Sequence, residues 1–288
     1  MQQSSLSNVI IMIWLILEVR AGITLLTKSL FMRYLKVSFI FAFVILLASC
    51  SKEDAPGPVS GDGFIIDHTS TKLAQIPSEW IDAAKEDLHI AYGHTSHGSQ
   101  LTGGMSGLVS FKGPSFSWSN GGTDGSLDLH DYAMTGDLGN PDRTSWAART
   151  RTYLAANPDV NVIIWSWCGQ VSDATEGNIE TYLSLMNELE RDFPGVAFVY
   201  MTGHLDGTGL TGNLHVRNEQ IRAYCRENGK ILYDFADIES YNPDGVYFGN
   251  KNPDDGCNYD TDGNGSRDGN WALEWQNAHT EGVDWFTC

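Results

Sequence analysis

A serine lies in a short polar loop that directly follows an apolar segment. The loop is Gly93-His94-Thr95-Ser96-His97-Gly98, and residues 88–92 before it predict a buried strand. Ligands bind at the carboxyl ends of strands in open α/β sheets, and flanking glycines leave a serine hydroxyl sterically free. Ser96 is therefore a candidate nucleophile. The alternative is an ordinary polar turn, which the same residue types also form.

Three histidines could bind a metal ion or line a substrate pocket. His94 and His97 flank Ser96, and His204 follows a later apolar segment. If both segments are strands of one parallel sheet, the three imidazoles lie at one edge, where they could bind a metal ion. A His-x-x-His spacing in a loop is a weak signal for a metal. The pattern favours a polar substrate pocket formed by these histidines and Asp237, which follows another apolar segment.

An acidic segment near the C-terminus has the spacing of a calcium loop. Asp260, Asp262, Asn264 and Asp268 occupy positions 1, 3, 5 and 9, where side-chain oxygens bind Ca²⁺ in EF-hand loops. Trp271 stands at position 12 in place of the glutamate, so the segment resembles the shorter calcium repeats of extracellular proteins. We predict a structural calcium ion in the C-terminal segment 254–288. The alternative is an acidic surface turn.

The elements that must position these residues alternate along the chain. Helices are predicted at 77–87, 142–157, 179–193 and 213–228, and strands at 88–92, 160–167, 196–201 and 230–235. This alternation predicts βαβ units and a parallel sheet within one α/β domain of residues 64–288. Residues 101–136, rich in Gly, Ser and Asp, predict a long loop on the active face. Loop residues of interest follow the successive predicted strands, and in a parallel sheet they would all lie at one edge. They are Ser96, Gly139, Gln170, His204 and Asp237.

This order of polar residues resembles the sequence blocks of the SGNH/GDSL hydrolase superfamily. Within residues 86–245, loop 93–98 is similar to a His-x-Ser-x-Gly variant of the first block, 136–140 to the second and 168–170 to the third. The resemblance implies a three-layer flavodoxin-like fold, in which helices cover both faces of a parallel sheet. It also implies that Ser96 is the nucleophile, and that the Gly139 N–H and the Gln170 amide stabilise the oxyanion.

The last block of that superfamily supplies the general base as Asp-x-x-His. A serine nucleophile needs such a base, itself oriented by a third group. The resemblance assigns the base to His279, and the alternative is a C-terminal histidine without a catalytic role. Gln276 stands three residues before it in place of the aspartate, which leaves the triad acid open among Glu274, Asp268 and Asp237.

Residues 1–49 predict a signal region. A basic start at 32–36, an apolar run at 37–46 and the sequence Leu47-Ala48-Ser49-Cys50 follow in the order of a secretory signal peptide. The last four residues resemble a bacterial lipobox, which implies that Cys50 is lipidated and anchors the protein in a membrane. Two further apolar runs come earlier, so we predict translation from Met32; the alternative is a membrane helix.

The residues after the lipobox bear on where the protein is sorted. Ser51 resembles the sorting signal for the outer membrane, and the protein would face the periplasm or the cell surface. Residues 50–63 are rich in Pro, Gly and Ser and predict a flexible tether.

Composition limits the partners. The chain has 18 basic and 36 acidic residues, which argues against nucleic acid and anionic membrane surfaces and suits a neutral substrate or calcium. An exported chain can form disulfides. We predict a bridge between Cys257 and Cys288, and either a second bridge or two buried thiols at Cys168 and Cys225.

These observations predict an exported, lipid-anchored serine hydrolase. We expect an ester substrate, such as an acyl group on a polysaccharide or a smaller carbohydrate, and no catalytic cofactor. One alternative is an inactive glycan-binding lipoprotein on the same fold, whose site would use its many tryptophans. Another is a metal-dependent hydrolase that uses His94, His97 and His204.

Overall fold

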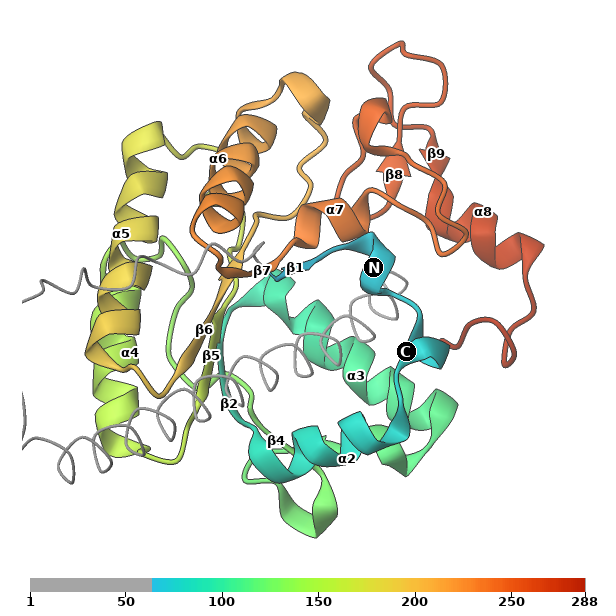
Figure 1. The fold of residues 1–288 in the computed structure, drawn as a ribbon. Helices are drawn as coiled ribbons and strands as arrows, with labels where there is room; N and C mark the ends of the chain where they lie inside the picture. The colour runs from blue at the N-terminus through green and yellow to red at the C-terminus, as the bar shows by residue number, and fades with distance from the viewer. Residues whose placement is uncertain (1–63, 288) are drawn as a thin grey trace, which may run out of the picture.

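The computed structural model describes residues 64–287 (Figure 1). The predicted signal region 1–49, the tether 50–63, the lipidation site Cys50 and the cysteine Cys288 lie outside this range. No helix among the described residues is long and apolar enough to cross a membrane.

Seven parallel strands form the central sheet, in the order β1-β7-β6-β5-β2-β4-β3. Their bounds are β1 Ile65–Ile66, β2 His89–Gly93, β3 Trp118–Ser119, β4 Leu127–His130, β5 Val162–Trp165, β6 Ala197–Met201 and β7 Ile231–Tyr233. The central strands are nearly continuous apolar runs, because both of their faces are buried. All four residues of β5 are buried, as are the last four of β2 and of β6.

Helices cover both faces of this sheet. In Figure 1, α4, α5 and α6 lie on one side and α2 and α3 on the other. The helices are α2 Ser78–Asp87, α3 Ser99–Lys112, α4 Ser145–Ala156, α5 Glu176–Asp192, α6 Asn213–Glu227, α7 Phe235–Glu239 and α8 Trp271–Ala278. Short 3-10 turns are η1 His68–Ser70, η2 Leu73–Gln75, η3 Ser96–Gly98, η4 Pro114–Phe116, η5 Thr123–Gly125, η6 Gly209–Thr211 and η7 Gly249–Lys251. The predicted single α/β body with a parallel sheet is confirmed.

Helix α5 shows how the sequence sets one of these elements. Thr175 and Asn178 form a reciprocal capping box at its start, which satisfies two backbone N–H groups that the helix leaves free. Its buried residues recur three or four positions apart, on one face. They are Ile179, Tyr182, Leu183, Met186 and Leu189.

The predicted loop at 101–136 is wrong over its first half. Helix α3 occupies residues 99–112, and strands β3 and β4 follow within the same range. Glycine disfavours a helix by about 1 kcal/mol per residue, so this glycine-rich segment carries no helical signal. Gly104 and Gly107 are buried with Leu101, Met105 and Leu108, and tertiary packing therefore overrides the poor intrinsic propensity.

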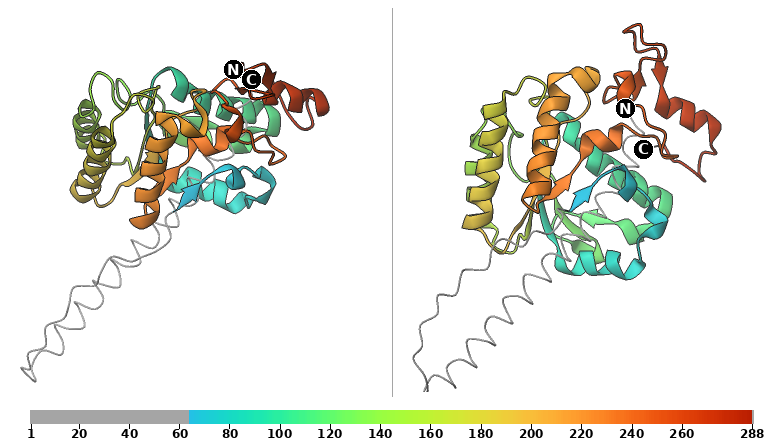
Figure 2. Two further views of the ribbon diagram at one scale, coloured as in Figure 1. Left: turned by 90° about the horizontal axis from the view of Figure 1, so that it is seen from above. Right: turned by 45° about the horizontal axis from the view of Figure 1, so that its top comes forward.

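The C-terminal segment forms a small lobe of its own beside the sheet. It carries a two-stranded antiparallel sheet of β8 Asn258–Tyr259 and β9 Gly269–Asn270, followed by α8. Its small core contains Phe248, Tyr259 and Trp271. Figure 2 shows in two further views that this lobe lies to one side, beyond α7.

A buried ion pair joins α6 to the end of β7. The Arg222 guanidinium donates from Nε and Nη2 to both oxygens of Asp234, at 2.6 and 2.7 Å. Asp234 also accepts a hydrogen bond from the Thr202 hydroxyl at 3.1 Å, after β6. Removing one partner of a buried pair leaves the other charge without compensation, which destabilises a protein strongly.

We expect Asp234→Ala to lower the free energy of unfolding by about 3–5 kcal/mol, because it leaves the buried Arg222 with only the half-exposed Glu219 as a carboxylate partner among the described residues. Urea unfolding measures this as a lower midpoint at unchanged slope. The matched control is Asp192→Ala, which removes an exposed pair with Arg151 at 2.8 Å and should cost less than about 1 kcal/mol. Equal losses for the two variants would contradict the structural role of the buried pair.

Candidate functional site

The carboxyl ends of the parallel strands meet at one edge of the sheet, which is where open α/β sheets bind ligands. The loop with Ser96 follows β2, and the loop with Gly139 follows β4. Gln170 follows β5, His204 follows β6 and Asp237 follows β7. The order of strands thus brings to this edge all five polar residues that the sequence placed there.

Ser96 has an unusual backbone conformation. It is the first residue of η3, three residues before α3 begins, and its φ angle is +27°. This region is strained for a residue with a Cβ atom, and such strain is often stored at functional sites. Ser96 is exposed, and within residues 64–287 its hydroxyl makes no hydrogen bond with the protein. It lies beside the positive end of the α3 dipole.

A buried carboxylate ties three loops together next to Ser96. Asp137 is 1 % exposed and accepts a hydrogen bond from the Thr95 hydroxyl at 2.6 Å. Its other oxygen accepts from the side-chain amide of Gln170 at 3.0 Å. Thr95 follows β2, Asp137 follows β4 and Gln170 follows β5, so this one carboxylate fixes their spacing.

The two predicted oxyanion donors lie against one another. Gly139 has φ +92°, and a Cβ at this position would come within 2.9 Å of the Gln170 Cβ. Only glycine therefore fits there. The Gln170 amide oxygen accepts the Cys168 N–H at 2.7 Å and one amide hydrogen goes to Asp137, which leaves the second amide hydrogen for another acceptor.

His94 is completely buried and faces Asp131. Its Nε2 lies 2.6 Å from the Asp131 carboxylate, and its ring is stacked on Tyr92 and tilted against Tyr132. Its other ring nitrogen, Nδ1, is buried without a hydrogen-bond partner. This histidine therefore does not join His97 and His204, and the predicted cluster of three histidines does not form as a single group.

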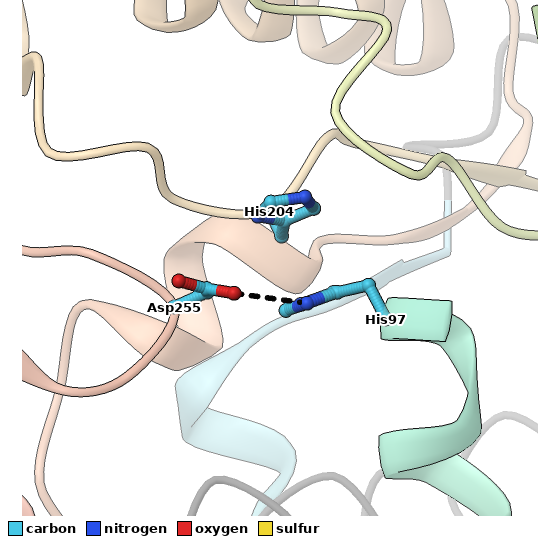
Figure 3. Close-up of side chains that lie close together, drawn as sticks. All are labelled: His97, His204 and Asp255. Carbon is cyan, nitrogen blue, oxygen red and sulfur yellow. Dashed lines mark ion pairs between the residues drawn. The ribbon is translucent and has the colours of Figure 1, made fainter. Parts of the chain in front are cut away.

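His97 and His204 converge with Asp255. The two rings stack with centroids 3.7 Å apart, and Asp255 Oδ2 lies 3.2 Å from His97 Nδ1. Figure 3 shows the three side chains gathered from three separate loops. His97 Nε2 lies 3.3 Å from Glu239, which is 2 % exposed.

The charges in this group reinforce one another. Burial opposes protonation of His97, but hydrogen bonds and charge from Asp255 and Glu239 outweigh it and raise the pKa of His97 to about 9. The hydrogen bond from His97 in turn lowers the pKa of Asp255. Both nitrogens of His97 thus face carboxylates, whereas His204 donates from Nδ1 to the Leu205 carbonyl at 3.0 Å and keeps Nε2 as an acceptor.

His279 lies at the end of α8, in the C-terminal lobe. Its ring stacks on Trp275, its Nδ1 donates to the Trp275 carbonyl at 2.7 Å, and its Nε2 lies 3.7 Å from Asp244. The described residues show no contact between His279 and Ser96, so the structure does not bring the predicted base and nucleophile together.

The three predicted triad acids have other partners. Glu274 accepts from the Tyr259 hydroxyl at 2.9 Å, and Asp268 from the Thr261 hydroxyl at 2.7 Å. Asp237 lies 2.5 Å from His68 Nδ1. Burial raises the pKa of Asp237, although the hydrogen bonds from His68 oppose that shift.

Asp237 also lines a cavity of about 240 Å³. Its charged lining includes Asp206, Glu219 and Arg222. Neither Ser96 nor His97 borders this cavity, so Asp237 faces a different space from the nucleophile.

In the predicted calcium loop, the side-chain oxygens accept hydrogen bonds from backbone N–H groups of the same loop. Asp260 is buried, and its carboxylate accepts N–H groups from 262–265. Asp262 and Asn264 accept from backbone N–H groups two residues later. Asp268 accepts from Thr261. The bound calcium ion stays a prediction.

No disulfide joins any two of the cysteines that the structure describes. They are Cys168, Cys225 and Cys257, of which the last two are buried. Cys168 and Cys225 therefore do not form the second predicted bridge. Cys288 lies outside the described residues, so its predicted bridge to Cys257 stays a prediction.

Comparison of the chain with protein-family models, with curated proteins and with solved structures found no match.

Sequence reasoning missed the carboxylates that organise the site. Asp131, Asp137, Glu239 and Asp255 each contact a residue that was singled out, but acidic residues are frequent in this chain and none forms a spaced motif with its partner. Asp131 comes directly after β4, but this strand lies within the range predicted as a loop, so its position gave no signal. The other three depend on loop conformations that a linear pattern does not contain.

We expect Asp137→Ala to lower the free energy of unfolding by about 2–3 kcal/mol, because it leaves the Gln170 amide and the Thr95 hydroxyl without their buried acceptor. Chemical denaturation measures the loss. Asp173→Ala is the control, since that carboxylate is 81 % exposed and pairs only with Arg143; it should change stability by less than about 1 kcal/mol. A loss at Asp137 no larger than at Asp173 would show that the network does not hold the loops.

Proposed function

We propose that the protein is a serine hydrolase of the SGNH type that acts on carboxylic esters. The arrangement of the sheet supports this proposal. Without the two-residue edge strands β1 and β3, the remaining order is β4-β2-β5-β6-β7. Numbered along the chain, this is 2-1-3-4-5, the order of flavodoxin-like folds.

The observation that carries the proposal is the exposure and backbone conformation of Ser96. Ser96 is exposed and lies on a strained turn at the carboxyl edge of the sheet, and its hydroxyl has no hydrogen-bond partner among residues 64–287. A serine held this way can approach a substrate carbonyl without first breaking a hydrogen bond. The positive end of α3 favours the negative charge that develops during the attack.

His94 is the best general base at this edge. Among the nearby histidines, His97 already has a carboxylate beside each ring nitrogen. His94 has the base-and-orienter arrangement of a triad, because Asp131 holds Nε2 at 2.6 Å and Nδ1 has no partner. His94 is also only two residues from Ser96, and catalytic hydrogen bonds are often long before substrate binds.

The reaction would follow the usual two steps of acyl transfer. His94 Nδ1 takes the proton of Ser96, the hydroxyl oxygen attacks the ester carbonyl, and the alcohol leaves with that proton. Water then cleaves the acyl-enzyme with the same base. The Gly139 N–H and the free amide hydrogen of Gln170 would stabilise the oxyanion at each step.

The substrate class follows from charge. The chain carries a net charge of −18, which favours a neutral substrate such as an acylated carbohydrate over an anionic one.

The alternative of a glycan-binding protein gains little support, because most of the tryptophans between 118 and 285 are not available for stacking on a sugar. Of these seven tryptophans, four are buried, and they are Trp146, Trp165, Trp167 and Trp271.

We expect Ser96→Ala to reduce hydrolysis of p-nitrophenyl acetate and butyrate by at least roughly 1,000-fold. His94→Gln should lower kcat by about 100-fold or more, because it removes the general base. His279→Gln is the matched control and should retain activity. Release of p-nitrophenol measures all three, and circular dichroism checks that each variant is folded.

Two results would contradict this assignment in different ways. Unchanged activity in Ser96→Ala removes Ser96 as the nucleophile. Loss of activity in His279→Gln with retention in His94→Gln restores the base that the sequence resemblance implied.

The N-terminal sequence supports a membrane-anchored location for this enzyme. The lipobox-like Leu47-Ala48-Ser49-Cys50 and the tether after it lie outside the described residues. We propose that Cys50 carries the lipid and that the domain is held at the outer membrane.

We expect Cys50→Ser to move the protein from the membrane fraction to the soluble fraction when it is expressed in a bacterium, because a lipid chain is its proposed anchor. Fractionation and immunoblotting measure the distribution. Ser49→Thr, which keeps the cysteine, is the control. Retention of Cys50→Ser in the membrane would instead support anchoring by the apolar segments of residues 1–49.

A further inference from the structure

The partly buried group of His97, His204 and Asp255 has no part in the proposed hydrolysis, yet its donor atoms are arranged as in a metal site. We propose that these three residues bind one divalent transition-metal ion, for which Zn²⁺ is the best match. The inference goes beyond the proposed hydrolase and does not depend on it, since it uses neither Ser96 nor His94.

The donor atoms are close enough to share an ion. One nitrogen from each ring and one Asp255 oxygen all lie within 4.8 Å of one another, and His97 Nδ1 is 3.2 Å from Asp255 Oδ2. Two ligands that each bind zinc at about 2.0–2.1 Å in a tetrahedral site lie roughly 3.3 Å apart. The distance between His97 and Asp255 therefore already matches one edge of such a site.

In each histidine ring, one nitrogen makes an outer contact with a protein oxygen and the other nitrogen is left to bind an ion. A metal-binding histidine usually donates its second ring N–H to a carboxylate or a backbone carbonyl. His97 Nε2 lies 3.3 Å from Glu239, and His204 Nδ1 donates to the Leu205 carbonyl. His97 Nδ1 and His204 Nε2 then remain as ligands.

Glu239 links these outer contacts. Its second oxygen accepts the backbone N–H of Leu205 at 2.8 Å, in the same residue whose carbonyl orients His204. One buried carboxylate thus positions both histidines. We infer that Glu239 is a positioning residue for the metal site and not a ligand.

The donor set selects the class of ion. Two imidazoles with one carboxylate suit zinc and other borderline transition metals, whereas calcium and magnesium prefer oxygen ligands throughout. The His97 side chain is 7 % exposed and that of Asp255 is 44 % exposed. The site is therefore closed on the histidine side and open on the aspartate side, where a water molecule could complete the coordination.

A second group of possible ligands suits an ion less well. Asp67, His68 and Asp237 also bring their donor atoms within 4.8 Å of one another. This group contains a single imidazole, and His68 Nδ1 is already paired directly with Asp237 at 2.5 Å. It provides a matched comparison, because it also places a histidine among carboxylates at a neighbouring strand end.

The test is zinc binding by the purified full chain after treatment with a chelator. Isothermal titration with Zn²⁺ should give one site per chain, and Co²⁺ bound in its place should show the visible absorption of a four-coordinate ion. We expect His204→Asn and Asp255→Asn to weaken binding at least about tenfold. Glu239→Gln should weaken it about 10- to 100-fold, as is typical of outer contacts.

Two variants serve as controls for the location of the ion. His68→Gln and Ser96→Ala should bind zinc like the wild type, and the second also separates this proposal from the hydrolase. Asp255→Asn alters a half-exposed side chain, so it keeps the test valid if a buried variant fails to fold. The proposal is overturned if the wild type binds no zinc, if Asp255→Asn binds it unchanged, or if His68→Gln abolishes binding.

Discussion

Every strand of the main sheet runs parallel, and this constraint decides where the polar loops must lie. Their carboxyl ends share one edge, so polar groups from loops far apart in sequence are brought together there and must form hydrogen bonds or ion pairs with one another. Three buried carboxylates do this. Asp137 joins the loops after β2, β4 and β5, Asp234 joins α6 to the ends of β6 and β7, and Glu239 joins the loops after β2 and β6.

Buried charges of this kind are costly unless each has partners. Asp234 is paired with Arg222, and Glu239 with His97. Asp137 has only neutral donors, so its charge is held by hydrogen bonds alone. Because loss of any one partner would leave a buried polar group unsatisfied, these contacts hold the loops around Ser96 to one another.

The sequence predicted the frame of the molecule better than its site. Alternating apolar runs and amphipathic helices identified β5, β6 and α5, since burial on both faces leaves a clear pattern. The glycine-rich helix α3 shows no such pattern in the sequence, because close packing stabilises it and intrinsic helix propensity does not. Ser96 and Gln170 were placed at the correct edge by strand order alone. Asp131, which pairs with His94, and Asp137, which pairs with Gln170, were not found, because contacts between loops depend on three-dimensional position.

The origin of Asp255 has a consequence for how the protein is made. The residue comes from the C-terminal lobe, whereas His97 follows β2 and His204 follows β6. During synthesis all seven strands leave the ribosome before this aspartate does. A chain cleaved between α7 and residue 255 would keep every strand of the main sheet and both histidines but would lose the carboxylate that completes their cluster. The cluster is therefore complete only after the lobe has been synthesised and has packed beside the main sheet.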